Sequence, residues 1–203
     1  MNDYVKRFLN KKSCVDLLPL FAMAKDCHKE ITESMGMLEA VRAFSDPGLP
    51  DEKKLVLVVG DGKTPRTAGL IAFNTKMLCV SVDPELNLVF CQDWFNETSA
   101  TRVELHKNKI EELTYCEIDE TEAIIIYPHS HAPMEFLYPR VKAKSVITIS
   151  MPCCIPIPNC MKSQRHITYV DKNILSGRNT IHVWHHVMNE KGVMRNAIGI
   201  HRS

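Results

Sequence analysis

Five short apolar runs in the middle of the chain limit the fold most strongly. They are LVLVV (55–59), MLCVSV (77–82), RVELH (102–106), AIIIY (123–127) and SVITIS (145–150). Strands that are buried on both faces of a parallel sheet need such nearly continuous apolar runs. Segments 64–75 and 132–143 lie between runs and predict crossover helices, the second with Pro133 in its first turn. The pattern therefore predicts an α/β fold with a doubly wound, mostly parallel sheet.

Different patterns flank these runs. Apolar residues at helical spacing between Asp3 and Phe44 predict two or three helices, which SDPGLP (45–50) ends because proline cannot continue a helix. Near the other end, HITYVDK (166–172) and NTIHVWHHVM (179–188) are joined too closely for a helical crossover, which predicts an antiparallel hairpin. We expect an N-terminal helical cap over residues 1–50 and an α/β domain over residues 51–203.

The composition is that of a globular protein. The 203 residues include 25 basic and 24 acidic side chains, which leave a net charge of +1. This balance does not indicate nucleic-acid binding through overall charge, although a local basic patch is compatible with it. No run reaches the ~18 apolar residues of a membrane span, and the N-terminus does not read as a signal peptide. We expect a cytoplasmic protein without membrane contact, whose eight cysteines are reduced thiols.

The sequence Gly62-Lys63-Thr64 after the first run matches the end of a P-loop motif. The motif GxxxxGK[ST] also needs a glycine five residues before Gly62, so that the loop can curl around the phosphates. That position is Leu57, inside the first predicted strand. The chain therefore does not fit an NTPase of the P-loop type.

The same stretch matches part of a dinucleotide-binding turn. Gly60 and Gly62 fit the first two glycines of GxGxxG, but Pro65 occupies the third position. Asp83 ends the second run, 23 residues after Gly60, where a carboxylate can accept hydrogen bonds from both ribose hydroxyls of an adenosine-containing ligand. The glycine turn and the acidic strand end together favour a nucleoside site over a tight turn without a ligand.

On these motifs the chain resembles the class I S-adenosylmethionine-dependent methyltransferases. The resemblance covers roughly residues 54–187 and includes VLVVGDGKTP, the acid of SVDPE, the KNKIEEL segment and the C-terminal hairpin. It implies a Rossmann-like sheet of seven strands whose last strand is antiparallel to the others. The family turn usually has a third glycine where Thr64 stands.

The resemblance also implies which residues bind S-adenosylmethionine. The turn would line the methionine and ribose side, Asp83 would hold the ribose hydroxyls, and Pro84 would lie beside the adenine. Asn108 or Lys109 would face the adenine amino group. The full set of candidate cofactor-binding residues is Gly60, Asp61, Gly62, Thr64, Asp83, Pro84, Asn108 and Tyr127.

Histidines and cysteines follow the last two parallel runs. If these strands are neighbours, His129, His131, Cys153 and Cys154 emerge side by side at one sheet edge. Three interpretations stay open: a zinc site, a histidine that acts as general base, or cysteines that pack as small apolar side chains beside hydrogen-bonded histidines. We assign His129 and His131 as candidate catalytic residues and assign no metal.

The sequence alone does not identify the acceptor of the methyl group. Amino-group methyltransferases of the family have an Asp or Asn followed by two prolines where this chain has Tyr127-Pro128-His129-Ser130, so N6-adenine methylation is not favoured. The Pro-Cys-Cys sequence at 152–154 is similar to that of a group of RNA-modifying methyltransferases, which makes RNA one candidate acceptor. The sequence predicts an S-adenosylmethionine-dependent methyltransferase; the alternative is an inactive fold that serves as an interaction or scaffold module for a protein partner.

Overall fold

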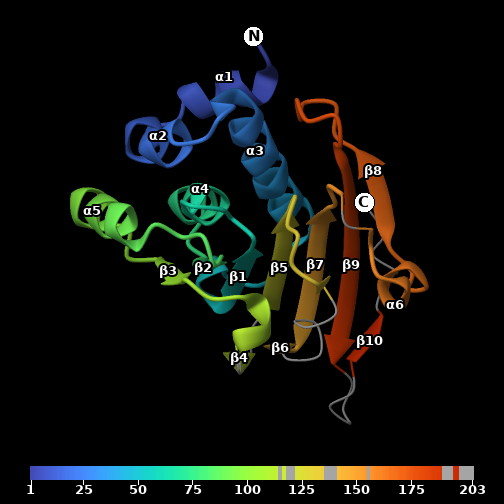
Figure 1. The fold of residues 1–203 in the computed structure, drawn as a ribbon. Helices are drawn as coiled ribbons and strands as arrows, with labels where there is room; N and C mark the ends of the chain where they lie inside the picture. Colours follow the sequence, from blue (N-terminus) through green and yellow to red (C-terminus); the bar gives the residue numbers. More distant parts are fainter. Residues whose placement is uncertain (114–115, 118–121, 135–140, 155, 189–193, 197–203) are drawn as a thin grey trace.

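The protein folds around one large mixed sheet, seen in a computed structural model (Figure 1). The structure describes residues 1–113, 116–117, 122–134, 141–154, 156–188 and 194–196. The sheet order is β10-β9-β7-β5-β1-β2-β3, and β8 also pairs with β9. Its strands are β1 (Lys54–Val59), β2 (Leu78–Val82), β3 (Val103–His106), β5 (Glu122–Pro128), β7 (Ser145–Met151), β8 (Ile167–Val170), β9 (Thr180–Met188) and β10 (Met194–Asn196).

The five apolar runs form the parallel part of the sheet, as predicted. β1 pairs in parallel with both β2 and β5, and the outer pairs β2–β3 and β5–β7 are parallel as well. Every side chain of β1 is buried, because the strand has packed layers on both faces. The continuous apolar pattern therefore has its expected structural cause.

The predicted C-terminal hairpin is also present. β9 lies between β7 and β8 and runs antiparallel to both, with Ile149 opposite Val183 and Ile167 opposite the same residue on the other side. The short strand β10 pairs antiparallel with the end of β9, a feature that the sequence analysis did not identify. The order and direction of the strands thus match the mostly parallel sheet with an antiparallel hairpin.

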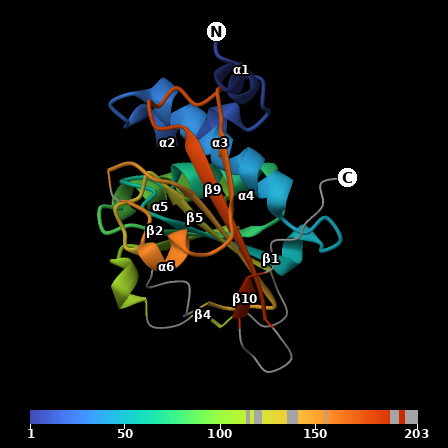
Figure 2. The same cartoon turned by 90° about the vertical axis from the view of Figure 1, so that its right-hand side faces the viewer.

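Five helices cover one face of this sheet (Figures 1 and 2): α1 (Asp3–Leu9), α2 (Cys14–Ala22), α3 (Cys27–Phe44), α4 (Arg66–Asn74) and α5 (Leu88–Thr98). The side chain of Asn2 caps α1 and that of Asp26 caps α3, so both helices begin where the sequence offers a hydrogen-bond acceptor. Phe8, Met35 and Ile124 belong to one apolar cluster. The predicted N-terminal helices therefore share a core with the sheet, while the domain boundary at residue 50 stays a prediction.

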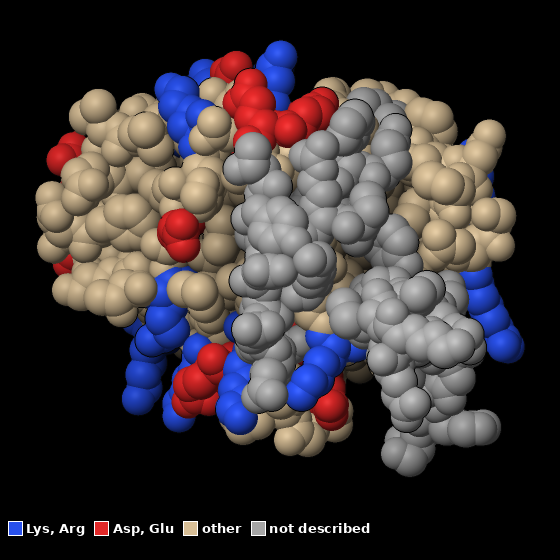
Figure 3. Space-filling model, turned by 90° about the horizontal axis from the view of Figure 1, so that it is seen from below, with Lys and Arg blue, Asp and Glu red and all other residues tan. Residues whose placement is uncertain are grey.

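The opposite face has a thinner cover in the described part of the chain. It consists of the 3-10 turn η2 (Ile110–Glu112), the small strand pair β4 (Cys116–Glu117) and β6 (Val141–Lys142), and the one-turn helix α6 (Asn159–Lys162). The helix predicted over 132–143 is wrong at its end, since Val141–Lys142 pairs as a strand, and residues 135–140 lie outside the described residues. Figure 3 views the molecule from below, and the described residues visible from that side include basic and acidic side chains intermingled.

Among the described residues, no helix has both the length and the apolar character that a bilayer crossing requires.

Candidate functional site

A cleft of about 470 Å³ lies at the carboxyl edge of the parallel strands. The segments that follow β1, β2, β3 and β5 all contribute to its wall, as expected for strands that end at one edge. Seven of the candidate site residues named from the sequence line it: Gly60, Asp83, Pro84, Asn108, Lys109, His129 and His131. The strand order thus brings together residues up to 71 positions apart in the chain.

The glycine turn after β1 needs both of its glycines. Gly60 and Gly62 have φ angles of +80° and +85°, in the left-handed region that other residues rarely adopt. A Cβ on Gly60 would clash with Ser130 Oγ, because the loop after β5 approaches the turn closely. A side chain at Gly60 would therefore obstruct the contact between the two loops that form this side of the cleft.

Asp83 braces this turn from the end of β2. Its Oδ2 accepts a hydrogen bond from the Gly62 N–H at 2.8 Å, and its Oδ1 accepts one from the Glu85 N–H at 2.7 Å. Each carboxylate oxygen has a second lone pair that can accept another donor. Asp83 is therefore anchored by the backbone and still offers acceptors to a ligand in the cleft.

Asp61 lies between the two glycines but is not part of the cleft wall. Its carboxylate is buried and accepts hydrogen bonds from the N–H groups of Thr67 and Ala68 at 2.9 and 3.1 Å, and from the Ser81 hydroxyl at 3.2 Å. Burial raises the pKa of this carboxyl, against the lowering effect of these hydrogen bonds. In this structure Asp61 satisfies the first turn of α4, and its contact with a cofactor stays a prediction.

Thr64 and Tyr127 also lie outside the main cleft. The buried Thr64 hydroxyl donates to the Leu20 carbonyl at 2.6 Å, so this side chain ties the turn to α2 and leaves the cleft side unobstructed. Tyr127 lines a second cavity of about 210 Å³ together with Ser150 and several prolines. The residues from Ser130 to Pro133 line both cavities. The second cavity therefore adjoins the cleft across one short loop.

Asn108 and Lys109 lie at the far end of the cleft, after β3. The Asn108 side-chain amide donates to Glu112 Oε2 at 3.3 Å, and the Lys109 N–H donates to the same oxygen at 3.1 Å. With its amide nitrogen donating to Glu112, Asn108 keeps a carbonyl oxygen as an acceptor for an amino group. Both residues are exposed, and Pro84 lies on the same cleft wall.

His129 is held in a polar contact that the sequence analysis did not identify. Its Nε2 lies 3.0 Å from Oε1 of Glu33, a buried residue of α3, and Lys29 Nζ lies 3.2 Å from the same oxygen. Burial raises the pKa of Glu33, but the contact with His129 and the charge of Lys29 outweigh this effect and lower it overall. Glu33 is therefore placed to orient the His129 imidazole.

The sequence does contain a pattern that marks Glu33 as a buried carboxylate. Glu33 shares a helical face with Met37 and Ala40, four and seven residues further on, and all three are buried. A carboxylate on such a face must find a cation or hydrogen-bond donors. The sequence does not show that the partner comes from a loop 96 residues away.

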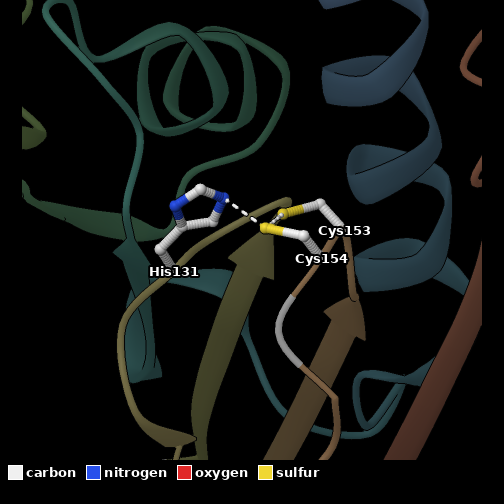
Figure 4. Close-up of side chains that lie close together, drawn as sticks. All are labelled: His131, Cys153 and Cys154. Carbon is white, nitrogen blue, oxygen red and sulfur yellow. Dashed lines mark hydrogen bonds between the residues drawn. The ribbon is translucent and has the colours of Figure 1, made fainter.

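His131 meets the two cysteines after β7 (Figure 4). Its Nε2 lies 3.1 Å from Cys154 Sγ, which lies 3.4 Å from Cys153 Sγ. The hydrogen bond with the Cys153 thiol raises the pKa of Cys154. Three of the four residues that were expected to meet do so, while His129 contacts α3 instead.

Solved structures with bound S-adenosylmethionine share this fold. A variant of MtNAS in complex with S-adenosylmethionine aligns with a TM-score of 0.56 and 13% identity, over 89% of this chain and 69% of that chain. Magnesium protoporphyrin IX methyltransferase (ChlM) from Synechocystis PCC 6803 with bound SAM aligns with a TM-score of 0.53 and 12% identity, over 91% of this chain and 96% of that chain. No family model and no curated protein matches the sequence. The chain has the class I S-adenosylmethionine-dependent methyltransferase fold.

Proposed function

We propose that this protein binds S-adenosylmethionine in the cleft at the carboxyl edge and transfers the methyl group to a nucleophilic acceptor. The observation that carries the proposal is the cleft itself. The glycine turn, Asp83, Asn108 and two histidines come from four strand ends and line one space of about 470 Å³. Solved structures with this fold hold S-adenosylmethionine, which supports the choice of ligand.

Asp83 is the proposed anchor of the ribose. Two backbone N–H groups fix its carboxylate, so little side-chain entropy is lost when the ribose hydroxyls donate to it. Gly60 lets the chain pass close to the methionine part of the cofactor, since it has no side chain to fill that space. Asn108 is the proposed acceptor for the adenine amino group, and Pro84 packs beside the ring.

His129 is the proposed general base. The acceptor attacks the methyl carbon in line with the sulfonium, and much of the rate enhancement comes from holding the two reactants in that geometry. If the acceptor carries a proton, His129 takes it through Nδ1, since its Nε2 faces Glu33. The Glu33 carboxylate then stabilises the imidazolium. His131 lies on the same wall as a second candidate.

The second cavity is the proposed entrance for the acceptor. It adjoins the cleft at residues 130–133 and contains Tyr127 and Ser150, which offer hydroxyl groups. RNA stays one candidate acceptor. Basic and acidic residues nearly balance in the chain, 25 against 24, so RNA binding would depend on shape more than on an extended basic surface.

Calorimetric titration tests the proposal. S-adenosylmethionine and S-adenosylhomocysteine should bind with one site per chain, whereas NAD and ATP should give no saturable heat. Asp83→Asn should weaken binding by roughly 10- to 100-fold, because the ribose loses charge-assisted hydrogen bonds. Asp93→Asn, on the exposed side of α5, is the matched control and should leave the affinity unchanged.

The outcomes separate the proposal from its alternative. Folded protein that binds neither S-adenosyl compound would refute the proposal and favour the inactive scaffold. Binding that is insensitive to Asp83→Asn would refute the assignment of the ribose site. Incubation with candidate acceptors, followed by mass spectrometry of the nucleoside product, then tests the transfer: S-adenosylhomocysteine indicates methyl transfer, and methylthioadenosine indicates attack on the other sulfonium substituent.

A further inference from the structure

His131, Cys153 and Cys154 form a cluster with the composition of a metal site. Their ligand atoms all lie within 4.8 Å of one another. They reach this position from the ends of two adjacent parallel strands, β5 and β7, whose pairing extends to Pro128 and Met151 (Figure 4). The cluster therefore depends on the sheet register and not on a single flexible loop.

The distances suit a small tetrahedral cation. Zinc binds thiolates at about 2.3 Å and imidazole nitrogen at about 2.0–2.1 Å, so tetrahedral ligands lie about 3.8 Å apart for two sulfurs and about 3.6 Å apart for sulfur and nitrogen. The corresponding distances here are 3.4 and 3.1 Å. A separation of the side chains by about half an ångström would admit the ion between them.

The donor set selects the ion. Two thiolates and one imidazole suit Zn²⁺, whereas Mg²⁺ and Ca²⁺ prefer oxygen ligands. Two cysteines and one histidine are also a set that occurs at zinc sites with an open fourth position. The contact between His129 and Glu33 draws that histidine toward α3, which leaves three protein ligands in the cluster.

We propose that His131, Cys153 and Cys154 bind one Zn²⁺ ion, with a solvent molecule as the fourth ligand. His131 and Cys154 are exposed, so the ion can enter and exchange its solvent ligand. His131 also lines both the cleft and the second cavity. The ion would fasten the loop after β5 to the loop after β7 at the place where the two cavities meet.

Metal titration of the full-length chain tests the site. Protein purified under reducing conditions and treated with chelator should take up one equivalent of Zn²⁺. It should also take up one equivalent of Co²⁺, with the intense near-ultraviolet absorption of thiolate-to-cobalt charge transfer and the visible bands of a tetrahedral site. Cys154→Ser and His131→Ala should each weaken Zn²⁺ binding at least about 100-fold, because each removes a direct ligand.

Cys160→Ser is the matched control. Cys160 is an exposed, free cysteine on the nearby helix α6, outside the cluster, and its loss should leave metal binding unchanged. The proposal fails if wild-type protein takes up neither ion, if bound Co²⁺ lacks the thiolate absorption, or if Cys160→Ser weakens binding as much as Cys154→Ser. Binding of S-adenosylmethionine is measured separately, so failure here leaves the proposed function untouched.

Discussion

His129 and His131 belong to one loop, but the first is largely buried and the second is exposed. The side chain of His129 is 15% exposed and faces the buried Glu33 of α3. His131, two residues later, is exposed and meets Cys154. His129 thus links the loop to the helical layer, whereas His131 links it to the neighbouring loop of the sheet edge.

The backbone explains this difference. In an extended strand, residues i and i+2 point to the same side, so the pattern His-x-His suggests two side chains that act together. His129 has a φ angle of +53°, a left-handed conformation that is uncommon outside glycine. Its N–H donates to the Met151 carbonyl at 3.0 Å, one residue beyond the last strand pair with β7. The loop turns there, and the two imidazoles diverge.

Removal of the Glu33 charge should cause the largest loss of stability among the variants that test these two surroundings. Glu33→Gln leaves the largely buried His129 facing a neutral amide, and we expect a loss of about 3 kcal/mol in the free energy of unfolding. Urea denaturation followed by circular dichroism measures this loss. It should be accompanied by weaker catalysis if His129 is the general base.

Glu39→Gln provides the control on the same helix. Glu39 also contacts two cations, Arg7 at 2.7 Å and Arg42 at 3.2 Å, but its side chain is 32% exposed. Water screens such pairs, so we expect a loss below about 1 kcal/mol. Equal losses of unfolding free energy for the two variants would show that the contact between Glu33 and His129 stabilises the fold no more than a half-exposed ion pair does.

Truncation of each histidine in turn should give the next largest difference. His129→Ala removes the partner of a buried carboxylate and should cost about 2 kcal/mol of unfolding free energy. His131→Ala, measured with chelator present, should change stability by less than about 0.5 kcal/mol because the side chain is exposed. The same denaturation experiment measures both variants, and a reversed order would contradict the described surroundings.

The sequence predicts the parallel sheet well for a physical reason. Buried parallel strands need continuous apolar runs, and every residue of β1, which contains LVLVV, is buried. The same pattern also predicts where the residues that follow the strands lie, because neighbouring parallel strands end at one edge of the sheet. Gly60, Asp83 and His129 therefore line one cleft.

What the sequence does not predict depends on contacts between distant segments. The roles of Asp61 and Thr64 in bracing α4 and α2 cannot be read from the glycine motif, because a buried hydrogen bond leaves no periodic signal. The cover over the second face is another example. Segment 132–143 carries Pro133 where a helix could begin, yet Val141–Lys142 pairs with β4, a partner that the local sequence does not show.

The smallest expected effect is a change in acid sensitivity. The pKa of Glu33 is lowered in the folded protein, whereas in the unfolded chain it should be about 4.3. A carboxyl with a lowered folded pKa contributes stability that is present above its unfolded pKa and is lost as the pH falls through its folded pKa. The stability difference between wild type and Glu33→Gln should therefore be constant from about pH 6 to pH 5 and decrease below about pH 4.

Denaturation curves at half-unit steps between pH 6 and pH 3 measure this decrease. Each curve is taken for wild type, Glu33→Gln and Glu39→Gln, so that the many other carboxyls of the chain cancel in the differences. A difference for Glu33 that stays constant down to pH 3 would mean that its carboxyl binds protons equally in the folded and the unfolded chain, and would contradict the lowered pKa. A difference that vanishes already at pH 6 would contradict the lowered pKa, and with it the contact that separates His129 from His131.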